Sequence, residues 1–273
     1  MVSDFDIYRF DLRGYLVVKG ALTSSEVSDL NETLDRLPPM KPGDWHGYIH
    51  GHSYGDKTSG LNLQQIYEAG DPFERLIDHP SWIEHVKLFV GAAGTFDNHH
   101  GPVFIDENFV SFRELGEAIG IHSGGVPATQ RSQFRYHAGR FMCGQINVLM
   151  ALTDIGPGDG GTMLIPGSHK SNFPLPSYND SRMGPGRSVD EVEDAVEIHL
   201  EAGDAIIFVD STCHGSAKRV NDGTRRICVY RYGPSWGNFR HGYHPSEELL
   251  ERLTPERRQI VQPQEHIPRP VAP

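Results

Sequence analysis

The sequence predicts a mainly β domain of the α+β class, with an antiparallel sandwich or barrel behind an N-terminal layer of helices. Two patterns support this prediction. Apolar residues follow helical spacing in the first hundred residues. After that point, short β-rich runs alternate with turns rich in Gly and Pro, at 103–112, 145–152, 162–165, 196–200, 205–209 and 226–232.

The N-terminal layer is predicted to begin with a short strand over 14–19. A helix follows, capped by Thr23 or Ser24 and ended by Pro38, because its apolar residues repeat at helical spacing. A second helical zone covers 72–90 and is broken at Pro80. Long loops are expected at 41–60 and 174–190, and the tail from residue 245 is expected to hold one short helix before an extended Pro-rich end.

The chain length of 273 residues fits one large domain or two modest ones. No linker-like composition marks a boundary, so one domain over 1–273 is favoured over two domains split near residue 100. Within it we expect the N-terminal strand and supporting helices over 1–100. The β core follows over 101–240, and a C-terminal helix and tail complete the chain over 241–273.

The charge balance limits the partners. A formal net charge of −11 disfavours binding to a nucleic acid polymer or an anionic membrane, because both need a cationic face. Three cysteines without a CxxC spacing disfavour a disulfide framework and a zinc ribbon. The few, odd-numbered cysteines fit a reducing cytoplasm, and no apolar run suits a signal peptide or a membrane span, so a cytoplasmic protein is expected. Fifteen histidines supply many candidate metal ligands.

The segment 203–226 carries the clearest chemical pattern. An apolar strand ends at His214, a turn follows, and a further strand opens with Arg225. This order places an imidazole and a guanidinium on neighbouring strands at one mouth of a barrel. Imidazole suits iron(II), and the guanidinium fork suits a carboxylate of a dicarboxylate cosubstrate. A one-residue register slip would put Arg226 in the place of Arg225.

Four segments in the same order resemble the phytanoyl-CoA dioxygenase-like family of iron(II)/2-oxoglutarate oxygenases: 10–18, 76–80, 166–169 and 203–225. The resemblance implies a double-stranded β-helix, the jelly-roll fold shared with cupins, and a need for Fe(II), 2-oxoglutarate and O2. It implies that His214 is the distal iron ligand, that Arg225 anchors 2-oxoglutarate and that Ser216 contacts it too. His169, although it lies in one of these segments, is expected to be a turn residue or a neighbour of the ligands.

The family's proximal motif, His-x-Asp or His-x-Glu, is absent from the expected zone. Two candidates replace it: His122-Ser123-Gly124 and His137-Ala138-Gly139. The strand end and following loop around His122 resemble the family context more closely. We therefore favour His122 and His214 as the metal ligands, with Gly124 at the position of the missing carboxylate.

Glycine in that position leaves a vacancy on a six-coordinate iron and removes one negative charge. A halide such as chloride would fill the vacancy, and this variant motif resembles the halogenases of the wider enzyme group. Halogenation of an unactivated carbon is therefore the first hypothesis. Hydroxylation is the second, with water in the vacant position or a carboxylate from elsewhere, such as Asp106 or Asp210. A non-catalytic small-molecule binding protein is the third.

The substrate is expected to be a small molecule. Cationic residues cluster near the proximal candidates and in the long loop, at Arg131, Arg135, Arg140, Lys170, Arg182 and Arg187. In an acidic chain they could hold a phosphate or carboxylate, which suggests a phosphorylated compound such as a nucleotide. Solvated surface charge explains any single one of them equally well.

Overall fold

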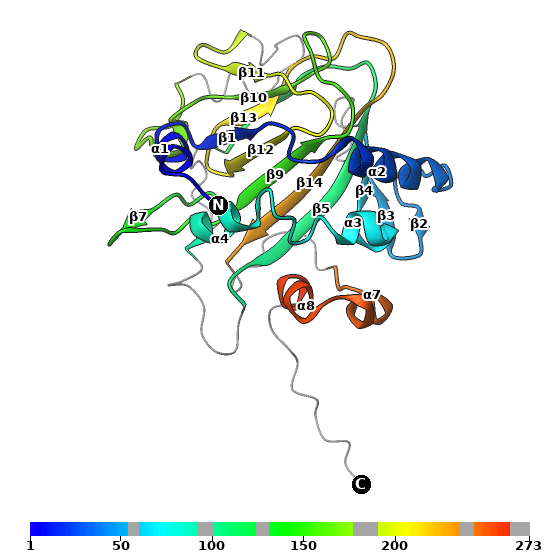
Figure 1. Ribbon diagram of the computed structural model, residues 1–273. Coiled ribbons are helices and arrows are strands. Elements are labelled where there is room, and N and C mark those ends of the chain that lie inside the picture. Colours follow the sequence, from blue (N-terminus) through cyan, green and yellow to red (C-terminus); the bar gives the residue numbers. More distant parts are fainter. Residues whose placement is uncertain (54–59, 92–100, 124–130, 177–190, 235–242, 263–273) are drawn as a thin grey trace.

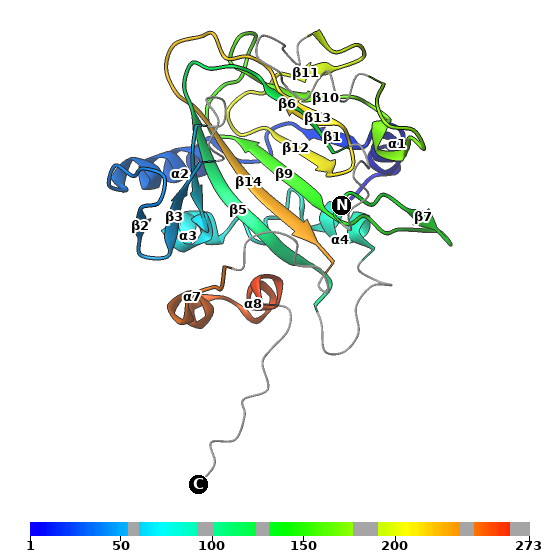
Figure 2. The same ribbon diagram turned by 180° about the vertical axis from the view of Figure 1, so that it is seen from behind.

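The computed structural model describes residues 1–53, 60–91, 101–123, 131–176, 191–234 and 243–262. Two antiparallel sheets form its centre, one above the other in Figures 1 and 2. The larger has the order β1 (Tyr15–Val18), β12 (Ala205–Val209), β9 (Ile146–Ala151), β14 (Arg225–Gly233), β5 (Phe104–Arg113), β4 (Leu61–Gln64), β3 (Ile49–His52), β2 (Trp45–His46). The smaller has the order β11 (Val196–Ile198), β10 (Thr162–Leu164), β13 (His214–Ser216), β6 (Ile119–His122). The predicted jelly-roll fold is confirmed.

Side chains alternate across the larger sheet with the two-residue period of a strand. One face of β5, β12 and β14 meets the smaller sheet in an apolar cluster that includes Phe109, Phe208, Ile227 and Leu164. The opposite face carries residues such as Cys228, which belong to a second cluster shared with the helices. The larger sheet is therefore covered on both faces, which shields its interior from water.

Helices cover the outer face of the larger sheet, as Figure 1 shows. The elements outside the two sheets are α1 (Asp4–Arg13), α2 (Ser24–Arg36), η1 (Ile66–Ala69), α3 (Asp71–Glu74), α4 (Ile83–Val90), η2 (Ser168–Lys170), α7 (Glu247–Arg252), α8 (Pro255–Val261) and the hairpin of β7 (Tyr136–His137) and β8 (Arg140–Phe141). The predicted helix after Thr23 is confirmed as α2. Thr23 and Glu26 form a capping box at its start, and Leu37 ends it before Pro38.

Three parts of the predicted secondary structure were wrong. The expected loop over 41–60 contains β2 and β3, and these extend the larger sheet because β2 pairs with β3 and β3 pairs with β4. The chain opens with α1 rather than with a strand, because Ser3 and Asp6 form a capping box. The tail holds two helices, α7 and α8, instead of one. Most of the expected loop over 174–190 lies outside the described residues.

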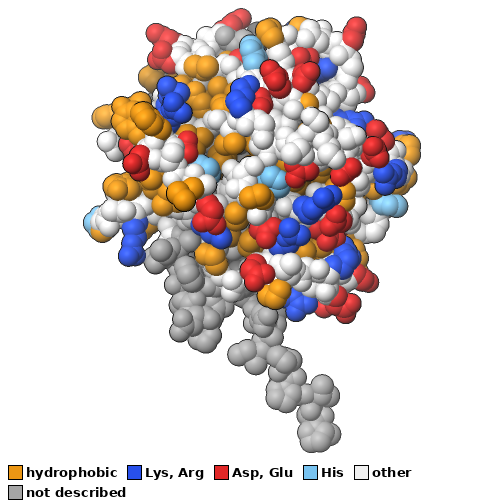
Figure 3. All heavy atoms as spheres, in the orientation of Figure 1, with side chains coloured by type: hydrophobic (Ala, Val, Ile, Leu, Met, Phe, Trp, Pro, Cys, Tyr) orange, Lys and Arg blue, Asp and Glu red, His pale blue; other side chains and the backbone are white. Residues whose placement is uncertain are grey.

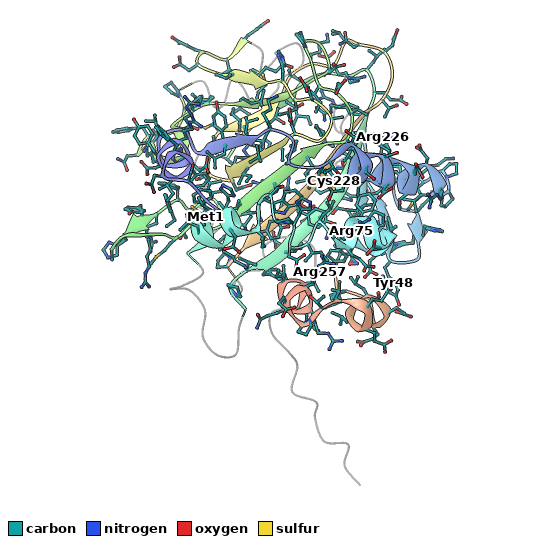
Figure 4. All side chains as sticks on the ribbon, in the orientation of Figure 1. Met1, Tyr48, Arg75, Arg226, Cys228 and Arg257 are labelled. Atoms are coloured by element: carbon teal, nitrogen blue, oxygen red, sulfur yellow. The ribbon has the colours of Figure 1, made fainter. Side chains whose placement is uncertain are left out.

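Within the described ranges, no helix has the length and apolar character needed to cross a bilayer. All three cysteines carry free thiols and are buried. Cys228, labelled in Figure 4, lies on β14 and belongs to the core beneath the helices. The cysteines therefore contribute to packing, since a buried thiol behaves as a small apolar side chain.

Candidate active site

Two histidines meet at the junction of β6 and β13. His122 ends β6 and His214 opens β13, and the two residues are direct partners across the strand pair. Their ring centroids lie 4.1 Å apart with an angle of 57° between the ring planes. The structure thus brings together the two imidazoles that the sequence favours as ligands, from positions far apart in the chain.

Each imidazole is held by the backbone carbonyl of the residue two positions earlier in the chain. Nδ1 of His122 lies 2.9 Å from the carbonyl oxygen of Gly120, and Nδ1 of His214 lies 2.7 Å from that of Thr212. A carbonyl oxygen only accepts hydrogen bonds, so each Nδ1 carries the proton. Each Nε2 then keeps its lone pair, which is the form of histidine that binds a metal ion.

The surroundings keep both rings neutral. Burial lowers the pKa of His122 below its ordinary value, and burial together with the neighbouring His122 lowers the pKa of His214. The negative charge of Asp210 acts in the opposite direction on both rings, and Arg231 adds to the lowering. A neutral imidazole pair at ordinary pH is ready to bind a cation without first releasing protons.

A close approach of the backbones produces this geometry. The pairing of β13 with β6 shifts register between His214 and Ser216. A Cβ atom on Gly215 would contact the carbonyl oxygen of Ile119 and would lie 3.1 Å from the carbonyl carbon of Gly120. Only glycine fits there, so the His214-Gly215 step itself allows the two strands to present their histidines side by side.

A cavity of about 120 Å³ lies between the two sheets at this point. His122 and His214 line it together with Arg225, and Thr162 and Ser216 line it too. Most of its other lining residues are apolar, including Phe109, Leu149, Phe208, Ile227 and Val229. A small polar anchor, an imidazole pair and apolar walls in one cavity are the features of a small-ligand site.

Arg225 lies deep in the cavity with 4% of its surface exposed. Its guanidinium donates to the carbonyl oxygen of Gly160 and to Oγ of Ser216, the latter over 3.2 Å. Burial lowers its pKa to about 9, and the nearby Arg113 and Arg219 add to the lowering. A bound carboxylate would offset the cost of this buried positive charge.

Ser216 connects the arginines to the backbone. Its hydroxyl donates to the carbonyl oxygen of Gly160 over 2.7 Å and accepts from Arg113 over 2.5 Å and from Arg225 over 3.2 Å. One donor and two acceptor positions are the full capacity of a hydroxyl. Ser216 thus holds the arginines in place and would have to release the Gly160 bond before donating to a ligand.

Sequence reasoning missed Arg113, which is 1% exposed and also donates to the carbonyl oxygens of Glu117 and Ala217. The predicted strand stopped at residue 112, one position short of it. The alternation of side chains did carry a signal, because Phe109, Ser111 and Arg113 share one face of β5. Arg231 and Asn147 line the same cavity and were missed as well.

Arg226 and His137, the two alternatives that the sequence left open, lie away from the cavity. Arg226 points to the outer face of β14, where it bonds Asn31 and Asp35 of α2 and lies beside that helix in Figure 4. His137 is exposed on the β7–β8 hairpin, which projects from the sheets in Figures 1 and 2. The positive φ angles of Ala138 and Gly139 form its tight turn, and this turn accounts for the second His-x-Gly.

His169 has a structural position. It is buried in η2, and its Nε2 lies 3.0 Å from the carbonyl oxygen of Asp11 on α1. Its ring packs edge-on against Phe134. His169 therefore joins the turn after β10 to the first helix, away from the cavity lining.

Gly124 lies outside the described residues, whereas the two alternative carboxylates fall inside them. Asp106 accepts from the side-chain amide of Gln145 over 2.8 Å. Asp210 accepts from the hydroxyl of Ser123, the residue next to His122, over 3.2 Å. Among the described residues, no three His, Cys, Asp or Glu side chains already stand in a metal-binding arrangement.

The cations expected to hold an anionic substrate are dispersed. Lys170 pairs with Asp11 over 3.1 Å, and Nε of Arg131 lies 3.8 Å from Asp210. Arg135 and Arg140 are exposed near the β7–β8 hairpin, while Arg182 and Arg187 lie outside the described residues. On the face in Figure 3, basic side chains are interspersed with acidic ones. The described surface thus gives no specific support for a phosphate site.

A jelly roll that holds a half-buried histidine, a buried histidine and a buried arginine in one cavity is typical of the cupin-like, metal-dependent oxygenases. The family model described as phytanoyl-CoA dioxygenase (PhyH) matches residues 10–227, and the chain belongs to this family. The dioxygenase cdmD of Talaromyces verruculosus is 31% identical over 270 residues, covering 91% of this chain and 80% of that protein. Family and relative together support an oxygenase.

Two solved structures share the fold. HygX from Streptomyces hygroscopicus, with nickel and 2-oxoglutarate bound, is 22% identical with a TM-score of 0.69, covering 91% of this chain and 94% of HygX. SnoN, an α-ketoglutarate-dependent epimerase from nogalamycin biosynthesis, is 18% identical with a TM-score of 0.56, covering 83% of this chain and 79% of SnoN. At these identities the likeness establishes the jelly roll.

Proposed function

We propose that this protein is an Fe(II)/2-oxoglutarate-dependent oxygenase that modifies a small molecule. One observation carries the proposal: His122, His214 and Arg225 line one cavity between the two sheets. The chemistry of these donors fits the cosubstrates. Two neutral imidazoles suit iron(II), and a buried guanidinium suits the distal carboxylate of 2-oxoglutarate.

Each residue has a distinct task. His122 and His214 hold the metal through Nε2, while the Gly120 and Thr212 carbonyls keep the protons on Nδ1. Arg225 orients the cosubstrate from the far end of the cavity, and Ser216 fixes the guanidinium. Apolar side chains such as Phe109 and Phe208 exclude water from the reacting groups. Iron and 2-oxoglutarate, when bound, supply the oxidising chemistry with O2.

A small natural product is the proposed class of substrate. The solved relatives support this class, since HygX has been crystallised with hygromycin B and SnoN with nogalamycin RO. A phosphorylated substrate remains a separate hypothesis. A phosphorylated compound and its dephosphorylated analogue test it, because equal binding of the two would rule it out.

Anaerobic titration tests the proposed function directly. Adding Fe(II) and then 2-oxoglutarate to the protein should produce the visible charge-transfer band of the bound pair. His214→Ala should abolish the band, and Arg225→Gln should raise the concentration of 2-oxoglutarate needed to form it. If equilibrium dialysis finds no iron retained by the unmodified protein, the protein is instead a non-catalytic binding protein.

Halogenation is a second candidate, favoured by one observation. The motif His122-Ser123-Gly124 offers no carboxylate where the family pattern has one, so chloride could complete the coordination of iron. Chloride should then shift the charge-transfer band, and the product should show chlorine isotopes. Gly124→Asp should remove halogenation. Hydroxylation instead predicts a product with one added oxygen and a charge-transfer band that does not shift when chloride is added.

A further inference from the structure

We propose that the cavity continues onto the inner face of β4 and β3 as a substrate-binding surface for a ring compound that bears hydroxyl or amino groups. The inference rests on the proposed function and names the substrate class of the same site. The side-chain amide oxygens of Asn62, Gln64 and Asn147 carry it. Each is buried and has no hydrogen-bond partner within the part of the chain that the structure describes.

The cavity leaves room for a second ligand beside the cosubstrate. Arg225 and Arg231 both line it and lie six residues apart on β14, which corresponds to about 20 Å along the strand. 2-Oxoglutarate anchored at Arg225 is shorter than this span. Asn147 lines the cavity at the other end, because it is the direct partner of Arg231 across β9 and β14.

Asn147 offers a hydrogen-bond acceptor at this end. Its side-chain nitrogen donates to Oδ1 of Asp210 over 3.5 Å, which fixes the orientation of the amide. Its Oδ1 is left without a partner among the described residues. A buried acceptor that stays unpaired lowers stability, and nearly all such groups in proteins are paired. A donor group on a bound molecule would satisfy this oxygen.

Two further amide oxygens extend the acceptor surface to β4. Gln64 is the direct partner of Phe109, and Asn62 is the direct partner of Ser111. Opposite residues in an antiparallel pair share one face of the sheet, and Phe109 and Ser111 line the cavity. Gln64 donates through Nε2 to Glu107 over 3.0 Å, so its unpaired end is the oxygen. The acceptors of β4 therefore lie on the same face as the cavity.

An aromatic stack lies next to these amides on β2 and β3. His50 is the direct partner of Gln64, and Trp45 is the direct partner of His50, so the three side chains share the inner face. The rings of Trp45 and His50 lie 4.4 Å apart with 17° between their planes. Nδ1 of His50 lies 2.6 Å from the hydroxyl of Tyr243. Trp45 is nevertheless 57% exposed, so it offers apolar area beside the amide oxygens.

This combination selects a class of ligand. Amide oxygens accept hydrogen bonds and donate none, so they match hydroxyl and amino groups and disfavour the oxygens of a phosphate. A purely apolar molecule would leave all three acceptors unpaired. A hydroxylated ring has donors at its edge and an apolar face that can pack on an indole. The surface therefore favours hydroxylated or amino-substituted rings over phosphorylated compounds.

The first test uses the protein without any ligand. Asn62→Leu replaces an unpaired buried amide by an apolar group of similar size, so the variant should unfold at a higher urea concentration than the unmodified protein. The matched control is Asn108→Leu. Asn108 and Asn62 are both 3% exposed, but Oδ1 of Asn108 accepts from the backbone N–H of Tyr67 over 2.9 Å. The control should unfold at a lower urea concentration, and an equal loss in Asn62→Leu would mean that Asn62 has only a structural role.

The second test measures binding of three matched probes to the whole protein by saturation-transfer NMR and isothermal titration. Glucose and glucosamine should bind more tightly than glucose 6-phosphate. Asn62→Leu and Asn147→Leu should each weaken the binding of glucose about tenfold, because each removes one acceptor. Asn108→Leu should bind glucose as the unmodified protein does. Circular dichroism checks that each variant is folded.

The outcomes separate this inference from the proposed function. The substrate class is overturned if neither glucose nor glucosamine binds, if glucose 6-phosphate binds most tightly, or if the variants bind glucose as the unmodified protein does. If Asn147→Leu does not fold, Asn62→Leu decides alone. Neither measurement uses iron, so a protein that binds the sugars but retains no iron would sink the proposed oxygenase and leave the binding surface standing.

Discussion

Arg113 and Arg225 are direct partners across β5 and β14, and both donate to the hydroxyl of Ser216. Two guanidinium groups thus share one acceptor in the buried end of the cavity. Like charges repel strongly where the dielectric constant is low, and this repulsion helps to lower the pKa of Arg225 to about 9. Arg113 therefore makes the cavity more attractive to an anion and holds Ser216 for Arg225.

Replacing Arg113 should accordingly weaken cosubstrate binding. We expect Arg113→Gln to raise the Kd for 2-oxoglutarate about tenfold, because it removes a nearby charge and one bond to Ser216. Metal affinity should stay unchanged. Isothermal titration with 2-oxoglutarate and with pyruvate, which lacks the distal carboxylate, measures the effect. The control is Arg226→Gln, one residue from Arg225 but on the outer face of β14, and an equal loss in both variants would argue against the role of Arg113.

Replacing the histidine in each of the two His-x-Gly segments should have opposite effects on iron binding. His122→Ala should abolish retention of iron(II), since His122 faces His214 across the strand pair. His137→Ala should retain iron as the unmodified protein does, because His137 is exposed on the β7–β8 hairpin. Equilibrium dialysis followed by elemental analysis compares the two. Loss of iron in His137→Ala alone would reverse the ligand choice.

The sequence predicts the candidate site residues better where they start regular strands. His214 opens β13 and Arg225 opens β14, the next strand along the chain, so local pattern alone places them at one end of the sheets. The choice between His122 and His137 depends on tertiary pairing, because each of them belongs to a His-x-Gly motif. In the structure, the pairing of β6 with β13 brings His122 to His214, whereas His137 is exposed on the β7–β8 hairpin.

The edge strands could not be predicted from local pattern. Residues 45–52 are rich in Gly and His and show no clear alternation, yet they form β2 and β3. These strands are stabilised by backbone hydrogen bonds from β2 to β3, from β3 to β4 and from β4 to β5. Such long-range hydrogen bonding leaves little trace in composition, as strand propensity depends strongly on context.

Substituting Gly14 tests how tightly the end of α1 packs against the turns that hold Thr212 and His169. Its φ is +82°, and a Cβ there would contact Oγ1 of Thr212 and lie 2.6 Å from Nδ1 of His169. We expect Gly14→Ala to destabilise the protein by about 3 kcal/mol, from backbone strain plus overpacking. Gly20→Ala, with φ +58° and no atom within 4 Å of the added Cβ, should cost only about 1 kcal/mol. Urea unfolding measures both, and equal losses would show that crowding at Gly14 is relieved without cost.

Glu26 should make stability depend on pH. Burial by itself raises its pKa, but hydrogen bonds from the backbone and hydroxyl of Thr23 and from His79 outweigh burial and lower the pKa to about 2. The folded state thus favours the carboxylate, and its stabilising effect is fully present above the ordinary pKa of 4.5 and is lost as the pH falls toward 2. Glu26→Gln should reduce the free energy of unfolding by about 1–2 kcal/mol at pH 7. The difference from the unmodified protein should shrink steadily below pH 4.5 in urea titrations, whereas a difference that stays constant with pH would mean that the charge of Glu26 does not stabilise the start of α2.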